Sequence, residues 1–173
     1  MTIGGRRLVP HLASGALATL LLASVTTVAD AAGPGRQPAP VGSAITATAF
    51  NKEGTALAVA RADGSVEIVD PSTGASRWNK DGAHGGAAVV GAVFVANGRL
   101  ATAGRDSVVR LWNEADGSAA GTLQGHSQPL TAIAASADGG TIVSGAEDTS
   151  AIVWNASGKL QQSYQVIAPL DMN

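Results

Sequence analysis

The sequence contains no cysteine and few histidines. Without cysteine the chain can form no disulfide, no zinc–thiolate site and no Cys-x-x-Cys-His haem attachment. Of its three histidines, only His84 and His126 lie beyond residue 31, and both belong to the repeated pattern described below. We therefore expect no metal site and no cofactor.

An excess of basic residues is also absent. The chain carries 11 Lys and Arg against 13 Asp and Glu. If residues 1–31 are removed, Arg6, Arg7 and Asp30 leave with them and the net charge becomes −3. Nothing in this balance indicates a nucleic-acid partner.

The apolar run near the N-terminus is short for a membrane span. It extends from Leu12 to Val28 and includes five Ser and Thr residues, whereas a membrane helix needs about 20 apolar residues. Arg6 and Arg7 precede it, and Ala29-Asp30-Ala31 has the small-x-small pattern that a signal peptidase cleaves. We predict a signal-peptide helix in residues 1–31, cleaved after Ala31, and an exported protein, periplasmic or secreted. An uncleaved anchor is the alternative, and no other membrane contact is expected.

The segment that follows has the composition of a linker. Gly33 to Pro40 contains two Gly and three Pro with no apolar period. We predict a linker over residues 32–43, a folded part over 44–168 and a short tail over 169–173.

The clearest pattern in the sequence is a set of four polar residues that occurs twice. The first copy is followed by the second at a distance of 42 residues: His84, Thr102, Asp106 and Trp112, then His126, Ser144, Asp148 and Trp154. A degenerate copy lies upstream, where Asp63 stands 43 residues before Asp106 and Val41, Val59 and Val69 replace the other three. A period of about 40 to 45 residues that ends in a Trp-Asp-like dipeptide is typical of four-stranded propeller blades. The three repeats span about 44–82, 83–124 and 125–168.

These residues make the chain similar to the WD-repeat (WD40-type) β-propeller family, in an exported form of bacterial type. Gly125-His126 opens a repeat that closes at Trp154-Asn155, and Ala83-His84 opens one that closes at Trp112-Asn113. The resemblance implies an all-β fold, a partial β-propeller of about three four-stranded antiparallel blades. It also implies that the tetrads are structural, because in this family the His hydrogen-bonds to the Asp of a tight turn, and the hydroxyl and the indole N–H complete the chain.

The short runs of β-forming residues between turn signals agree with three blades. In chain order we expect strands at 45–50, 56–61, 65–69, 75–78, 88–95, 99–104, 108–112, 119–123, 130–135, 141–145, 151–154 and 159–166.

A cluster of Ser, His and Asp also suggests a hydrolase. The set occurs twice at the spacing of a blade, and no Gly-x-Ser-x-Gly turn surrounds Ser144 or Ser127 to expose a nucleophile. We therefore expect no enzyme activity.

The resemblance implies a scaffold that binds other proteins. Partners would contact the face that carries the turn before each structural Asp and the start of each inner strand. The candidate residues on this face are Arg105, Glu147, Pro129 and Thr131, together with Ala44, Thr46, Ala62, Ala87 and Val89. The alternative is that Arg105 and Glu147 are solvated turn charges.

Three blades are too few for a closed propeller, which uses about four to eight. The open faces of the first and third blades would expose apolar side chains. We consider three explanations: part of a longer propeller, which is favoured; two copies joined in a six-bladed ring; or capping by another protein.

A second family resemblance supports an alternative function. The segment from Gly64 to Trp78 is similar to the tryptophan-docking repeat of quinoprotein dehydrogenases, so the chain could be a fragment of an exported quinoprotein-like or cytochrome-fused propeller enzyme. Such enzymes need a calcium site of carboxylate and amide oxygens, and the sequence shows no such cluster.

Overall fold

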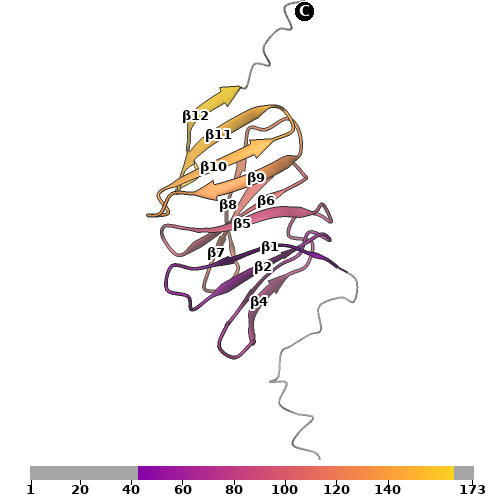
Figure 1. Ribbon diagram of the computed structural model, residues 1–173, viewed down its shortest axis with the longest axis vertical. Coiled ribbons are helices and arrows are strands. Elements are labelled where there is room, and N and C mark those ends of the chain that lie inside the picture. The colour runs from indigo at the N-terminus through magenta and orange to yellow at the C-terminus, as the bar shows by residue number, and fades with distance from the viewer. Residues whose placement is uncertain (1–42, 166–173) are drawn as a thin grey trace, which may run out of the picture. The chain divides into compact units, whose positions relative to one another are not determined.

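The computed structural model describes residues 43–165, which form twelve strands and no helix (Figure 1). The strands make three four-stranded antiparallel sheets that follow one another along the chain. The predicted all-β fold with three four-stranded units is therefore confirmed for this part of the chain. The signal-peptide helix, nearly all of the linker, Val41 and residues 166–173 lie outside the described residues.

Each sheet is built from four consecutive strands. The first sheet contains β1 (Ile45–Phe50), β2 (Leu57–Arg61), β3 (Val66–Val69) and β4 (Ser76–Lys80). The second contains β5 (Val89–Val95), β6 (Arg99–Gly104), β7 (Val108–Asn113) and β8 (Ala119–Gln124). The third contains β9 (Leu130–Ala135), β10 (Thr141–Ala146), β11 (Ser150–Asn155) and β12 (Leu160–Gln165). The predicted strands match these within one or two residues.

The three sheets are structural copies of one unit. The first strand of each sheet has a register shift near its start. The pairing of the third and fourth strands has a second register shift, which follows Ile68, Leu111 and Val153 in the three sheets. The spacing between these last three residues is 43 and then 42 residues, as in the sequence repeat. Residues of one sheet can therefore be compared with their equivalents in the others.

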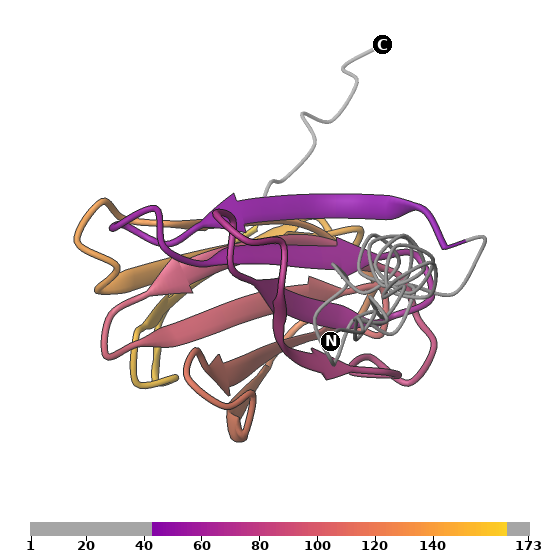
Figure 2. The same cartoon turned by 90° about the horizontal axis from the view of Figure 1, so that it is seen from below.

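The first strand of each sheet is its inner strand. β1 packs beside β5, and β5 packs beside β9, whereas β4, β8 and β12 form the outer edges. Figure 2 shows the purple strands of the first sheet side by side, joined by turns at both ends. Among residues 43–165 there is no helix of the length and apolarity that a membrane span requires.

The apolar core lies between the sheets rather than within any one of them. One cluster joins the first sheet to the second, and another joins the second to the third. Each sheet therefore depends on its neighbour to bury its apolar side chains, as expected for a repeat architecture.

Candidate functional site

The first tetrad lies at one end of the second sheet. His84 stands in the loop between β4 and β5, Thr102 on β6, Asp106 in the β6–β7 turn and Trp112 on β7. His84 Nδ1 is 2.9 Å from Asp106 Oδ1, His84 Nε2 is 2.8 Å from Thr102 Oγ1, and Trp112 Nε1 donates to the same hydroxyl at 2.9 Å. A neutral imidazole satisfies all of these groups, because Nδ1–H can donate to Asp106 while the Thr102 hydroxyl donates to Nε2.

The second tetrad repeats this arrangement in the third sheet. His126 Nδ1 is 3.1 Å from Asp148 Oδ2, and His126 Nε2 is 2.9 Å from Ser144 Oγ. Trp154 Nε1 donates to Ser144 Oγ at 2.9 Å. The structure thus places all eight sequence-predicted tetrad residues in two hydrogen-bonded chains.

Two further residues, Arg110 and Ser150, contact the aspartates of the tetrads and were not identified from the sequence. Arg110 forms an ion pair with Asp106. In the third sheet the Ser150 hydroxyl donates to Asp148 Oδ1 at 2.6 Å, and the Ser150 amide donates to the same atom at 3.0 Å. A serine two residues after the structural Asp is a sequence signal that could have been recognised, because this spacing favours an Asx-type turn.

The first sheet replaces the tetrad with a buried ion pair. Arg61 Nη2 lies 2.5 Å from Glu67 Oε2, and both side chains are largely buried. Asp63 accepts bonds from the amide and the hydroxyl of Ser65 at 2.9 and 2.7 Å, as Asp148 does from Ser150. The Asp-x-Ser turn is therefore kept in this sheet, and the His-to-Trp chain is absent from its described residues.

The charge states follow from burial and hydrogen bonding. Burial lowers the pKa of His84, although its bond to Asp106 opposes this. Partial burial raises the pKa of Asp106, but hydrogen bonds from His84 and Arg110 outweigh it, so that this pKa lies below its usual value. Desolvation also acts to raise the pKa of Asp148, and it is outweighed by bonds from Ser150, Ser127 and His126, which leave this pKa far below its usual value. At neutral pH both aspartates are ionised and His84 is neutral.

The tetrads are closed to substrates. Thr102 and Ser144 are fully buried, and both hydroxyls are engaged by imidazole and indole nitrogens. No buried side-chain nitrogen or oxygen of residues 43–165 lacks a hydrogen-bond partner. In the same residues no group of three or more His, Cys, Asp or Glu side chains is placed to hold a metal ion. The arrangement can stabilise turns, and it presents no accessible nucleophile.

The candidate partner-binding residues lie at the β6–β7 and β10–β11 turns and at the start of β9. Arg105 and Glu147, from neighbouring sheets, form an ion pair at 2.7 Å in which both side chains are about half exposed. Pro129 is half-buried and Thr131 is exposed. This surface therefore offers a neutralised charge pair that connects two sheets.

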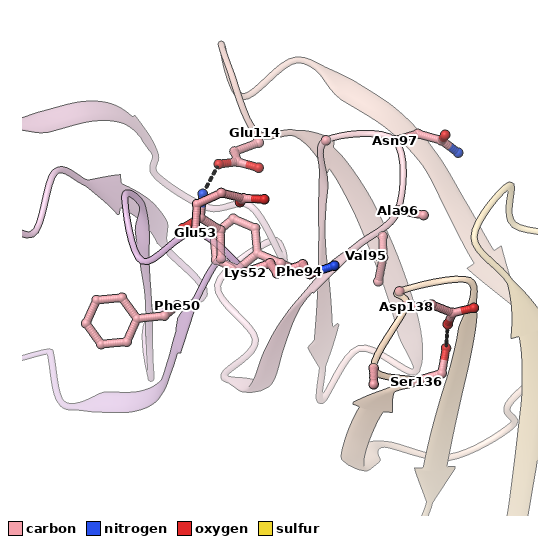
Figure 3. A pocket seen from close by; sticks show the side chains of 14 residues that line it. Phe50, Lys52, Glu53, Phe94, Val95, Ala96, Asn97, Glu114, Ser136 and Asp138 are labelled. Carbon is pink, nitrogen blue, oxygen red and sulfur yellow. Dashed lines mark hydrogen bonds between the residues drawn. The ribbon is translucent and has the colours of Figure 1, made fainter.

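A cavity at the opposite ends of the inner strands was not predicted. Its volume is about 430 Å³, and it is lined by the β1–β2, β5–β6 and β9–β10 turns and by Glu114 (Figure 3). Its charged residues are Lys52, Glu53, Glu114 and Asp138. Asn51 connects the first and second sheets in the wall of this cavity, because its Nδ2 donates to Glu114 Oε1 at 2.8 Å. A site shared by three turns that are distant in sequence carries no local sequence signal.

Comparison with known proteins agrees with this architecture. The family model "WD domain, G-beta repeat" (WD40) matches residues 78–113 and 117–155. The first segment begins on the outer strand β4, and the second begins in the turn between β7 and β8. Each ends at the Trp-Asn position of the following sheet. The three sheets resemble the blades of a WD propeller.

One curated relative and several solved structures are similar to the chain. An uncharacterized WD repeat-containing protein of Schizosaccharomyces pombe is 32% identical over 99 residues, which are 57% of this chain and 24% of that protein. The chain thus spans about a quarter of the length of this relative. The computationally designed Ika4 protein is 31% identical with a TM-score of 0.62, over 71% of this chain and 73% of Ika4. A chain of the Mitotic Checkpoint Complex has 22% identity and a TM-score of 0.65, over 73% of this chain and 38% of that chain, and shows the shared fold.

Proposed function

We propose that the chain is a non-catalytic scaffold of WD-type blades that binds other proteins. The observation that supports this most directly is the state of the polar tetrads: the residues that resemble catalytic groups are buried and mutually hydrogen-bonded. What remains available for partners is the surface formed by the turns. One solved structure of similar fold is a chain of the Mitotic Checkpoint Complex, which is consistent with this role.

The cavity is the surface that we propose for partner binding. Three carboxylates, those of Glu53, Glu114 and Asp138, line it together with the single ammonium of Lys52. Asp138 is already held by the Ser136 hydroxyl at 2.5 Å, and the nearby Lys52 ammonium helps to lower its pKa. The excess of negative charge favours a partner segment with basic side chains, because complementary charges attract and orient the partner.

The Arg105–Glu147 surface is the second candidate for the same function. Its support is the resemblance to the WD-repeat family and the exposure of both side chains. Because each charge is already paired, a partner that docks here must contact the pair as a unit or separate it, and rim charges of this kind contribute little affinity.

Affinity capture with surface variants tests the function and separates the two surfaces. The full chain is immobilised, and the proteins it retains from an extract of its own cells are quantified by mass spectrometry. We expect Glu53→Lys to reduce recovery of the retained partner several-fold. The control Lys159→Glu changes charge on the exposed β11–β12 turn, away from the cavity lining, and should leave recovery unchanged.

The variants give different results for the two surfaces. If Arg105→Glu reduces recovery while Glu53→Lys does not, the partner uses the turns of the tetrad end instead of the cavity. If no protein is retained above a blank matrix, the scaffold function is contradicted.

We also propose that residues 1–31 direct export and are removed after Ala31. The support is the arginine pair, the apolar run and the Ala29-Asp30-Ala31 pattern. Intact-mass measurement of the protein from the exported fraction should show a chain that starts at Ala32. Recovery of the full-length chain in the cytoplasmic fraction would contradict export.

A further inference from the structure

Consecutive sheets meet through one repeated interface. Each sheet has a trailing face, which packs on the next sheet, and a leading face, which receives the previous one. The trailing faces contribute Ala58, Ile68 and Trp78 from the first sheet, and Ala101, Leu111 and Leu123 from the second. The leading faces contribute Val89, Leu100 and Trp112 from the second sheet, and Leu130, Ile142 and Trp154 from the third.

In the second and third sheets, a glycine in the turn between the third and fourth strands receives a side chain from the outer strand of the preceding sheet. A Cβ built on Gly117 would lie 2.7 Å from Cδ2 of Trp78, and one built on Gly158 would lie 2.9 Å from Cδ2 of Leu123. The equivalent residue of the first sheet is Gly74, where a Cβ would meet no atom within 4 Å. All three glycines have a positive φ, of 68°, 91° and 70° respectively. Within residues 43–165, the first sheet thus keeps the receiving turn with no side chain packed on it.

The leading face of the first sheet exposes its apolar residues. Ile45 is 61% exposed, whereas its equivalents in the two internal interfaces, Val89 and Leu130, are 0% exposed. Phe50 is 60% exposed, whereas its equivalent Phe94 is half-buried against the core between the first and second sheets. In Figure 3 the Phe50 ring points away from the other labelled side chains of the cavity.

The trailing face of the third sheet is exposed in the same manner. Val143 is 37% exposed, whereas its equivalents Ala58 and Ala101 are 0% exposed. Tyr164 occupies the position of Leu123 in the register and is 51% exposed, whereas Leu123 is 3% exposed. Four of the five large hydrophobic residues exposed among residues 43–165 therefore lie on these two faces.

We propose that two copies of this chain associate head to tail, so that the trailing face of the third sheet in each copy packs on the leading face of the first sheet in the other. The partner surface fits because it is the next repeat of an interface that the molecule already forms twice. Residues 43–165 of two copies supply six sheets, within the range of about four to eight that closed propellers use. A head-to-tail contact forms a closed ring when its rotation closes, and here both junctions become equivalent. This assembly is independent of the proposed partner-binding function.

The mass of the full chain in solution tests this proposal. Light scattering over a dilution series should give twice the mass of a single chain. Ile45→Glu and Val143→Glu each place a charge on one of the two faces, at side chains that are exposed within a single copy. Each variant alone should reduce the mass to that of one chain without changing the circular dichroism spectrum, because every junction uses both faces. Thr122→Glu, on the exposed edge of β8, should keep the two-chain mass.

Other results overturn the proposal. A single-chain mass at every concentration excludes the assembly and leaves the scaffold function to its own capture test. If only one of the two face variants loses the two-chain mass, the same face of both copies forms the contact, and the copies do not associate head to tail. Larger species that persist in both variants show an association that does not use these faces.

Discussion

The His84 imidazole forms the centre of a chain of hydrogen bonds that begins at the Trp112 indole and ends at the Asp106 carboxylate. Each bond contributes roughly 0.5 to 1.5 kcal/mol net, but an unpaired buried group costs more. The chain links the loop before β5 to the β6–β7 turn and to β7. Its role at the residue scale is therefore to fix three segments of one sheet relative to each other.

Alanine substitutions of the three structural aspartates should differ in their cost. Asp106→Ala and Asp148→Ala each remove the acceptor of a buried imidazole, and should lower the free energy of unfolding by about 1 to 3 kcal/mol. Asp63→Ala should cost less, because the Asp63 carboxylate accepts hydrogen bonds from Ser65 of its own turn rather than from a buried imidazole. Urea denaturation of the three variants measures this order, and equal losses would contradict it.

The neutral state of His84 predicts a stability that falls on acidification. Burial lowers the folded-state pKa of His84, whereas an unfolded histidine titrates near about 6.5. Its contribution to stability is present above that pH and declines below it, because the unfolded chain binds the proton more readily. The lowered pKa values of Asp106 and Asp148 add a second loss below about 4, where unfolded aspartates become protonated.

Denaturant unfolding between pH 7 and pH 5 measures the histidine contribution. The wild-type midpoint should fall over this range, and the slope should be shallower in His84→Gln, which cannot take up the proton. An unchanged slope in that variant would assign the pH dependence to other groups.

Gly104 packs under the first tetrad without a side chain. A Cβ at this position would overlap His84 Nδ1 and Asp106 Oδ1, so Gly104→Ala should destabilise the protein by about 1 to 3 kcal/mol. The matched control is Gly145→Ala on β10, where the nearest atom to the new methyl would be 3.9 Å away; its cost should stay within about 0.5 kcal/mol. Thermal unfolding of both variants measures this difference in stability. Equal melting temperatures would show that the tetrad relaxes around the methyl group.

At the scale of elements, the outer strands connect one sheet to the next. Trp78 on β4 packs on Gly117 of the following sheet, and its indole N–H donates to the Glu114 carbonyl at 2.8 Å. The same strand position carries no large side chain in the second sheet, where Gly121 pairs with Leu111. Contacts between sheets are therefore made by different residues of a shared framework.

Trp78 should be the most costly residue of β4 to remove. Trp78→Ala leaves a cavity between two sheets and should cost about 3 to 5 kcal/mol, while Trp78→Phe should lose about 1 kcal/mol with the indole hydrogen bond. Asn79→Ala on the same strand alters an exposed side chain and should change stability by less than about 0.5 kcal/mol. Chemical denaturation ranks the three variants, and a comparable loss in Asn79→Ala would place the interface elsewhere.

The strands were predictable because their signals are local, and the contacts between them were not. Alternation of apolar residues and turn pairs such as Asp116-Gly117 act within a few residues, so the predicted strands agree with β1–β12 closely. The Arg61–Glu67 pair and the bond from Asn51 to Glu114 join residues that the register or the packing of two sheets brings together. No periodic pattern marks such residues, and the cavity between three turns was missed for the same reason.

At the scale of the whole molecule, the two uncovered faces link folding to association. Each internal interface buries its apolar residues almost completely, whereas the two end faces expose equivalent residues such as Ile45, Val143 and Tyr164. Burial of apolar area is the dominant favourable contribution to folding. A chain with two such faces exposed is less stable alone than in the proposed ring.

Stability should therefore depend on protein concentration. When a folded chain binds a second copy and the unfolded chain does not, mass action stabilises the folded state, and the melting temperature rises with concentration. We expect this rise for the wild type and its absence for Ile45→Glu, whose face cannot pack on Val143 and Tyr164 of another copy. Scanning calorimetry at concentrations on both sides of the dissociation midpoint gives the comparison, with Thr122→Glu as the control that should follow the wild type. If the melting temperature of the wild type is constant over that range, each chain folds with its end faces uncovered, and the apolar residues on them do not contribute to stability through a second copy.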